Sequence, residues 1–177
     1  MRLDELLEAY HHRDHNGWLA QNIAHHRTML LIDAGRYAEA EQAGKAWAEL
    51  GFDWTFGRVC HGAAMAETLD ALGRTREGLA VLEDALSAPD PKRVGIAWLY
   101  LEDLVGLSEK LGQPVDPKWR GLAEESAAAN GVEMPQHESL GKAILELGKA
   151  IQKKLGVGDD DEDEDDDIEP KEPTSVE

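Results

Sequence analysis

The chain of 177 residues has a single cysteine, Cys60, which excludes an internal disulfide framework and a cysteine-rich zinc site. It also lacks any run of 18 or more apolar residues, the length that a membrane-spanning helix requires. Its first five residues, MRLDE, are mostly charged, whereas a secretory signal needs an apolar segment. These absences predict a protein of a reducing compartment, and we expect it in the cytoplasm.

Positive charge is scarce, because 18 lysine and arginine residues are set against 36 aspartate and glutamate residues, a net charge of -18. Residues 159–177 hold 12 acidic residues and one lysine, a net of -11, so residues 1–158 carry the remaining -7. A nucleic-acid backbone is bound by lysine and arginine side chains that displace its counterions, so direct binding of DNA or RNA is not expected. The excess of carboxylates favours a basic partner.

Sequence motifs of catalysis are missing as well. The chain has neither a glycine-rich phosphate loop nor a Gly-x-Ser-x-Gly turn. Cys60 and His61 are adjacent, and neighbouring residues on a helix point about 100° apart, so we do not expect them to act as a nucleophile and its base. The sequence therefore predicts neither an enzyme nor a bound cofactor.

What the sequence does contain is a bend that recurs. Between residues 58 and 92, apolar and small residues at helical spacing form two runs, separated by the tripeptide LGR at 72–74. A similar bend occurs 38 residues earlier, around Gly35, and 39 residues later, at 111–113. Two helices this short cannot bury an apolar face alone. The spacing therefore predicts three helical hairpins stacked on one another.

The first third of the chain is expected to hold three helices. Residues 2–15 form an amphipathic opening helix that ends near Gly17, a typical helix stop. The next two helices cover residues 18–34 and 37–50. The helix over 18–34 is expected to turn four apolar side chains inward: Leu19, Ile23, Leu30 and Leu31.

The C-terminal half is expected to hold the third hairpin and a cap. Asp116 is a candidate N-cap for a return helix over residues 119–129. Residues 139–155 have the pattern of an amphipathic capping helix. Beyond it, residues 159–177 are dense in like charge and are expected to be disordered. The chain thus divides into one helical repeat domain, residues 1–158, and an acidic tail.

The hairpin over residues 58–92 resembles the tetratricopeptide repeat family, and the first unit is similar to it. The matching residues are Leu72, Gly73, Glu77, Ala85 and Leu86, and in the first unit Gly35, Tyr37 and Ala40. The resemblance implies an all-α fold, a short right-handed α-solenoid of about three hairpins with N- and C-terminal capping helices. It also implies a protein–protein interaction scaffold, since the family consists of such scaffolds.

The resemblance implies candidate partner-binding residues, because in the family the first helix of each hairpin lines a concave groove. By register from the turn glycines, these candidates are Asn22, His25, Met29, Asp33, Glu67, Asp70, Glu102 and Glu109. Related grooves that hold acidic chaperone C-termini use lysine, arginine and asparagine there, so the acidic lining predicts a different ligand. A basic or amphipathic segment of another protein fits better. The open alternative is a charged helix face that is simply solvated.

Two other functions stay open. An acidic inhibitor or immunity-like protein would mask the basic face of one nuclease or toxin. A metal-binding protein would use the N-terminal histidines, of which His11 and His15 have the i, i+4 spacing of ligands on one helix face, with His12 and Asp14 beside them. No third ligand follows at a fixed spacing, so no metal is assigned. The acidic tail is either an inert solubilising segment or an element that contacts a basic surface.

Overall fold

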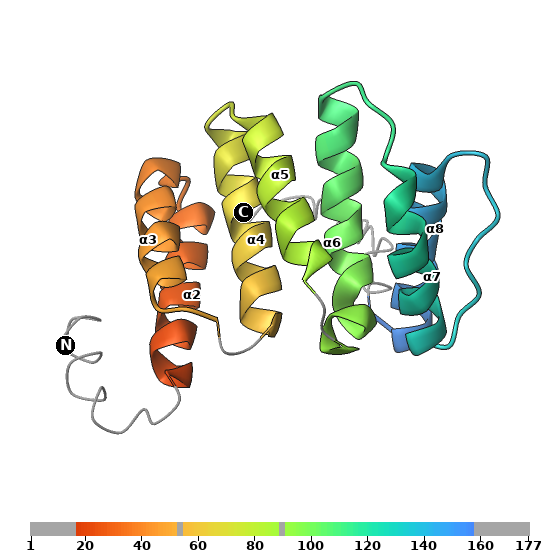
Figure 1. Cartoon of the computed structure of the whole chain (residues 1–177), viewed down its shortest axis with the longest axis horizontal. Helices are drawn as coiled ribbons and strands as arrows, with labels where there is room; N and C mark the ends of the chain where they lie inside the picture. The colour runs from red at the N-terminus through yellow and green to blue at the C-terminus, as the bar shows by residue number, and fades with distance from the viewer. Residues whose placement is uncertain (1–16, 53–54, 89–90, 158–177) are drawn as a thin grey trace, which may run out of the picture.

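A computed structural model describes residues 17–52, 55–88 and 91–157. Every regular element in these ranges is helical, which confirms the expected all-α fold (Figure 1). The elements are α2 (Trp18–Asp33), α3 (Tyr37–Glu49), α4 (Thr55–Ala71), α5 (Thr75–Ser87), α6 (Pro91–Lys110), the 3₁₀ turn η1 (Pro117–Trp119), α7 (Arg120–Ala129) and α8 (Leu140–Leu155). The expected helix over residues 2–15 and the acidic tail over 159–177 lie outside the described residues.

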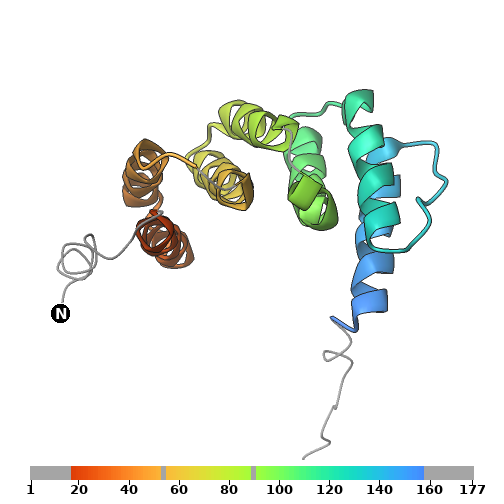
Figure 2. The same cartoon turned by 60° about the horizontal axis from the view of Figure 1, so that its bottom comes forward.

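The helices form successive hairpins that stack side by side. α2 pairs with α3, α4 with α5, and α6 with α7. In Figure 2 the hairpins follow a curved line, with α2, α4 and α6 toward its inner side and α3 and α5 toward its outer side. Because α2 packs on α4 and α4 packs on α6, the first helices of the three hairpins form a continuous inner wall. α8 packs on α6 and α7 at the C-terminal end of the stack.

The three recurring bends have the same backbone structure. Gly35, Gly73 and Gly112 have φ angles of 67°, 75° and 65°, in the left-handed region that glycine enters without strain. At each bend the glycine N–H donates to the carbonyl three residues back, and the following N–H donates to the carbonyl five residues back, at 2.8–3.0 Å. This pair of bonds is the Schellman motif, which ends a helix and reverses the chain. The bends predicted from the 38- and 39-residue spacing are therefore confirmed.

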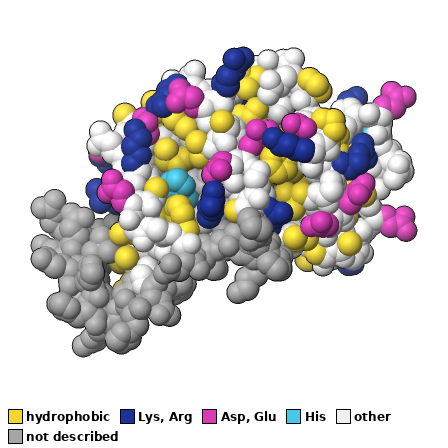
Figure 3. Space-filling view, viewed as in Figure 1, with side chains coloured by type: hydrophobic (Ala, Val, Ile, Leu, Met, Phe, Trp, Pro, Cys, Tyr) yellow, Lys and Arg dark blue, Asp and Glu magenta, His cyan; other side chains and the backbone are white. Residues whose placement is uncertain are grey.

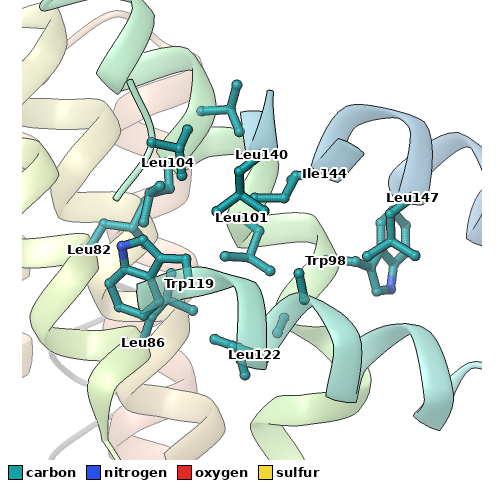
Figure 4. Packing of buried hydrophobic residues seen from close by; sticks show 14 of the residues in the cluster. Leu82, Leu86, Trp98, Leu101, Leu104, Trp119, Leu122, Leu140, Ile144 and Leu147 are labelled. Atoms are coloured by element: carbon teal, nitrogen blue, oxygen red, sulfur yellow. The ribbon is translucent and has the colours of Figure 1, made fainter. Parts of the chain in front are cut away.

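The larger of two hydrophobic cores joins the last two hairpins and α8 (Figure 4). Leu82 of α5, Leu101 of α6 and Ile144 of α8 are completely buried in it. The smaller core lies in the first two hairpins around Trp47, whose side chain is 1 % exposed. Since both cores span neighbouring hairpins, each hairpin depends on the next for its burial.

Local signals at the C-terminal end were predicted correctly. The Asp116 carboxylate accepts the Lys118 N–H at 2.9 Å, so Asp116 is the N-cap, and the chain enters α7 through η1. The apolar face of α8 is buried at Leu140, Ile144, Leu147 and Ile151. None of the helices in the described ranges is both long and apolar enough to cross a membrane.

The prediction that Leu30 of α2 points inward is wrong. Leu30 was expected to be buried, but its side chain is 68 % exposed. Helical periodicity places Leu30 on an apolar face of α2, but it does not say whether a neighbouring helix covers that face. No described element covers Leu30, although Ile32, two residues later, is 4 % exposed.

Candidate functional site: the inner groove

The inner wall contains a hollow of about 560 Å³, which we call the inner groove. Side chains of α2, α4 and α6 line it, and these helices belong to three different hairpins. No single hairpin could form this groove, so it exists only because the hairpins stack.

The structure places the eight predicted partner-binding residues in two groups. Five line the groove: His25, Met29, Glu67, Asp70 and Glu102. The other three, Asn22, Asp33 and Glu109, are not part of its lining. Asp33 still acts on the groove, because its negative charge contributes to the raised pKa of Glu67. The role of these residues in binding stays a prediction.

Two register positions recur in the lining of the groove. The residues ten positions before the turn glycines are His25, Ala63 and Glu102, and those six positions before are Met29, Glu67 and Gly106. All six line the groove. The register of the first two hairpins is therefore kept in the third, where the sequence pattern is weakest.

Small residues keep the groove open. Ala63 and Ala66 of α4 lie in its lining, and a Cβ placed on Gly106 of α6 would meet no atom within 4 Å. The floor also includes the apolar side chains of Met29 and Leu107. A glycine inside a helix costs roughly 0.5–1 kcal/mol relative to alanine. Gly106 therefore makes α6 less stable than alanine would, and it leaves the groove free of a side chain at this position.

Three carboxylates in the groove make no salt bridge with any described residue: Glu67, Glu102 and Asp103. Partial desolvation raises the pKa of each, and a neighbouring carboxylate raises it further. For Asp103 the neighbour is Glu67, and the pKa rises to about 6. Asp103 is an exposed residue, so the shift reflects the protein atoms around a concave site and not enclosure, and solvent weakens its effect on stability.

Asp70 differs from these three carboxylates. It accepts hydrogen bonds from the ammonium group of Lys110 and from the hydroxyl of Thr75, the latter at 2.7 Å. The Lys110 bond is the main cause of the lowered pKa of Asp70. Asp70 thus links α4 to α6, and its charge is already balanced.

The cysteine and tyrosine of the groove contact each other. The Cys60 sulfur lies 3.2 Å from the Tyr100 hydroxyl, and burial raises the pKa of both groups. A thiol with a raised pKa is a poor nucleophile near neutral pH. The His61 Nε2–H donates to the Gly44 carbonyl at 3.0 Å, which holds the imidazole against α3. Cys60 and His61 therefore have different hydrogen-bond partners.

His25 borders the groove as part of an aromatic stack. Its ring lies 5.1 Å from the Trp47 ring and 5.2 Å from the His26 ring, measured between centroids. Burial, and secondly the charge of His26, lower the pKa of His25. The cluster of His11, His12, Asp14 and His15 lies outside the described residues, and within those residues no group of three or more histidines, cysteines or carboxylates could hold a metal ion.

Among the lining residues that were not candidates, Tyr100, Asp103 and Lys110 have titratable side chains that reach the groove from α6. Register transfer from the turn glycine selects single positions on each helix face. α6 has 20 residues against 16 in α2, and it turns both Glu102 and Asp103 into the groove. The adjacent acidic pair in the sequence is the only signal that could have suggested Asp103.

Outside the groove, charges of both signs occur together. On the face shown in Figure 3, basic, acidic and hydrophobic side chains are interspersed. Several acidic residues are paired there or elsewhere on the surface, for example Glu39 with Arg36 and Asp84 with Arg58. Other exposed carboxylates, such as Glu124 and Glu125, also make no salt bridge to a described residue. Glu67, Glu102 and Asp103 differ from them because they line one hollow and have raised pKa values.

Comparisons with known protein families, with curated proteins and with solved structures give no match. The resemblance to tetratricopeptide repeats therefore rests on the residues quoted above.

Replacing Asp103 by asparagine should stabilise the protein at pH 7.5 by about 1 kcal/mol, a value discounted because solvent still reaches this side chain. The folded pKa of Asp103, about 6, lies above the unfolded value near 3.8, so its ionisation penalises the fold above pH 6. The penalty disappears as the pH falls toward 4. Urea denaturation of both proteins between pH 4.5 and 7.5 measures the difference, in which contributions of His25 and His61 cancel. A difference that does not change with pH would contradict the assignment.

Proposed function

We propose that the chain is a non-enzymatic scaffold that binds a basic or amphipathic segment of another protein in the inner groove. One observation carries this proposal: Glu67, Glu102 and Asp103 share an apolar-floored hollow without a salt bridge to a described residue. Their raised pKa values mean that ionisation is less favourable in the groove than in water. A lysine or arginine side chain of a partner would remove that penalty and gain a charge-assisted contact.

The apolar part of the lining suits the same ligand. Lysine and arginine have aliphatic stems that pack on apolar surface while the charged group reaches a carboxylate. Met29, Ala63 and Leu107 offer such a surface beside the acidic side chains. An amphipathic segment would use the apolar lining for affinity and the carboxylates for orientation.

The net charge of the chain supports a basic partner, and its one cysteine supports a reducing compartment. The net charge of -18 would speed the encounter with a basic protein and would make the rate sensitive to salt. The one cysteine is buried beside Tyr100 and unpaired, which supports a reducing compartment. We therefore place the scaffold and its partner in the cytoplasm.

The double variant Glu67→Gln with Asp103→Asn should weaken the binding of a fluorescent peptide of alternating lysine and leucine about tenfold, because two charge contacts are lost. The matched control is a double variant of α7, Glu124→Gln with Glu125→Gln, which removes the same charge from exposed positions. Fluorescence anisotropy at fixed ionic strength gives both affinities. Affinity for the unaltered chain should also fall as the pH is lowered from 7.5 to 5.5, because Asp103 becomes protonated.

Equal weakening by the two double variants would show that the peptide responds to net charge alone, and the groove would lose its proposed role. The same conclusion would follow if a neutral leucine and serine peptide bound as tightly as the basic one.

A further inference from the structure

The first hairpin has an apolar face that no described element covers. Leu30 is 68 % exposed, and with Leu31, Ala43 and Ala46 it forms the apolar part of a hollow of about 450 Å³ between α2 and α3. The other lining residues are polar or charged: Arg27, Arg36, Glu39 and Gln42. We call this the end face. It lies on the hairpin nearest the N-terminus of the described chain, where residues 1–16 lead into α2.

The repeat register shows what the corresponding face of the other hairpins contacts. Five positions before the turn glycine, α2 has Leu30, α4 has Thr68 and α6 has Leu107. Thr68 is 0 % exposed and Leu107 is 6 % exposed. In both cases the second helix of the preceding hairpin packs on that first helix, α3 on α4 and α5 on α6. In α4, Met65 and His61 lie against Gly44 of α3, three and seven positions before Thr68 and so on the same helix face. The position of Leu30 is thus on the face that a preceding second helix approaches.

Residues 2–15 carry the pattern of such a second helix. The buried face of α3 consists of Ala40, Gly44 and Trp47, and the apolar residues Leu3, Leu7 and Tyr10 stand 37 positions earlier with identical spacing. The connection also has the same length, because α4 begins eight residues after Trp47 and α2 begins eight residues after Tyr10. A helix of 14 residues is about 21 Å long, enough to run antiparallel to most of α2 and reach Leu30.

An ion pair between α5 and α3 supports the same register for residues 2–15 against the first hairpin. Arg74, at the start of α5, holds Glu77 and also donates from Nη1 to Glu41 of α3 at 2.9 Å. Arg36, at the start of α3, holds Glu39 in the same way, but its Nη1 makes no hydrogen bond to a described residue. The position that corresponds to Glu41, 37 residues earlier, is Asp4.

We propose that residues 2–15 dock as a helix on the end face, in the register that α3 has on the second hairpin. Leu3, Leu7 and Tyr10 then face α2, and Asp4 pairs with Arg36. The inference does not depend on the proposed ligand of the inner groove. It does bear on the groove, because α2 supplies His25 and Met29 to the lining and the docked helix would hold α2 in place.

A cross-link between positions 7 and 27 tests this register in the full chain. In the second hairpin the corresponding positions are Gly44 and Met65, and a Cβ on Gly44 would contact the Met65 side chain. Leu7→Cys with Arg27→Cys, made in a Cys60→Ser chain, should therefore form a disulfide within one molecule under mild oxidation. Gly44→Cys with Met65→Cys is the positive control. Glu8→Cys with Arg27→Cys is the negative control, because Glu8 corresponds to Lys45, whose side chain is 66 % exposed.

The expected result is an intramolecular disulfide formed at a rate close to that of the positive control and well above that of the negative control. Adding Asp4→Arg should slow it about fivefold, and adding Arg36→Asp to that chain should restore the rate. A disulfide-linked dimer would overturn the proposal in favour of a second copy of the chain on the end face. Cross-linking no faster than the negative control would overturn it as well.

Discussion

Replacing Gly78 by alanine should lower the free energy of unfolding by about 2 kcal/mol. Gly78 is buried in α5, and a Cβ there would lie 2.7 Å from the backbone oxygen of Ala66 and 3.3 Å from its Cα. Backbone atoms of α4 cannot swing away as a side chain would, so the two helices must separate. This cost exceeds the gain of about 1 kcal/mol that alanine normally brings to a helix.

The matched control for Gly78→Ala is Gly106→Ala, the same change inside α6 where a Cβ would meet nothing within 4 Å. It should raise the free energy of unfolding by about 0.5–1 kcal/mol. Urea denaturation followed by helical circular dichroism measures both. Similar effects of the two substitutions would contradict the close approach of α4 and α5.

Replacing Ile144 by alanine should cost about 3 kcal/mol of stability, the largest effect that we expect on the C-terminal side of the stack. Ile144 has no exposed surface and belongs to the core that α8 shares with α6 and α7 (Figure 4). The deletion leaves a cavity between helices that the neighbouring side chains can fill only in part.

Lys142→Ala is the control for Ile144→Ala, since Lys142 is exposed on the same helix and its loss should change stability by less than about 0.5 kcal/mol. Hydrogen exchange of the α8 amides adds a second readout, because loosening α8 should increase their exchange before the other helices are affected. Equal stability of the two variants would mean that α8 does not belong to the cooperative stack.

The α8 helix also matters for the groove. The Glu102 carboxylate lies against Gly148, at a place that a Cβ would occupy, and Lys149 is close enough to oppose the rise in the pKa of Glu102. A helix predicted only as a cap therefore also contacts one of the carboxylates that line the inner groove. Glu102 is not one of the buried core residues. A substitution of Glu102 would therefore test ligand binding without removing part of the core that α8 stabilises.

The sequence predicted the features that local chemistry determines. At Gly35, Gly73 and Gly112 a glycine ends an apolar run in a Schellman bend, and the left-handed conformation that the bend needs requires no tertiary partner. The N-cap at Asp116 and the apolar face of α8 are equally local. The spacing of the bends then led to stacked hairpins and to the helices that line the groove.

The sequence could not give features that depend on how helices cross. Asp103 lies in the groove because α6 turns two adjacent acids toward α4, and Asp70 is balanced because Lys110 reaches it from α6. Leu30 is exposed because its face lies at the end of the described stack. Periodicity defines the face of a helix but does not identify what covers it.

In the proposed function, the inner groove binds a basic segment through the carboxylates of Glu67, Glu102 and Asp103. The most direct measurement is amide chemical-shift mapping of the full chain during titration with the lysine and leucine peptide. If the peptide binds in the inner groove, the largest shifts will cluster on α2, α4 and α6, around Met29, Glu67, Asp103 and Gly106. Shifts confined to the outer helices α3 and α5, or spread evenly over acidic residues of the whole surface, would contradict it.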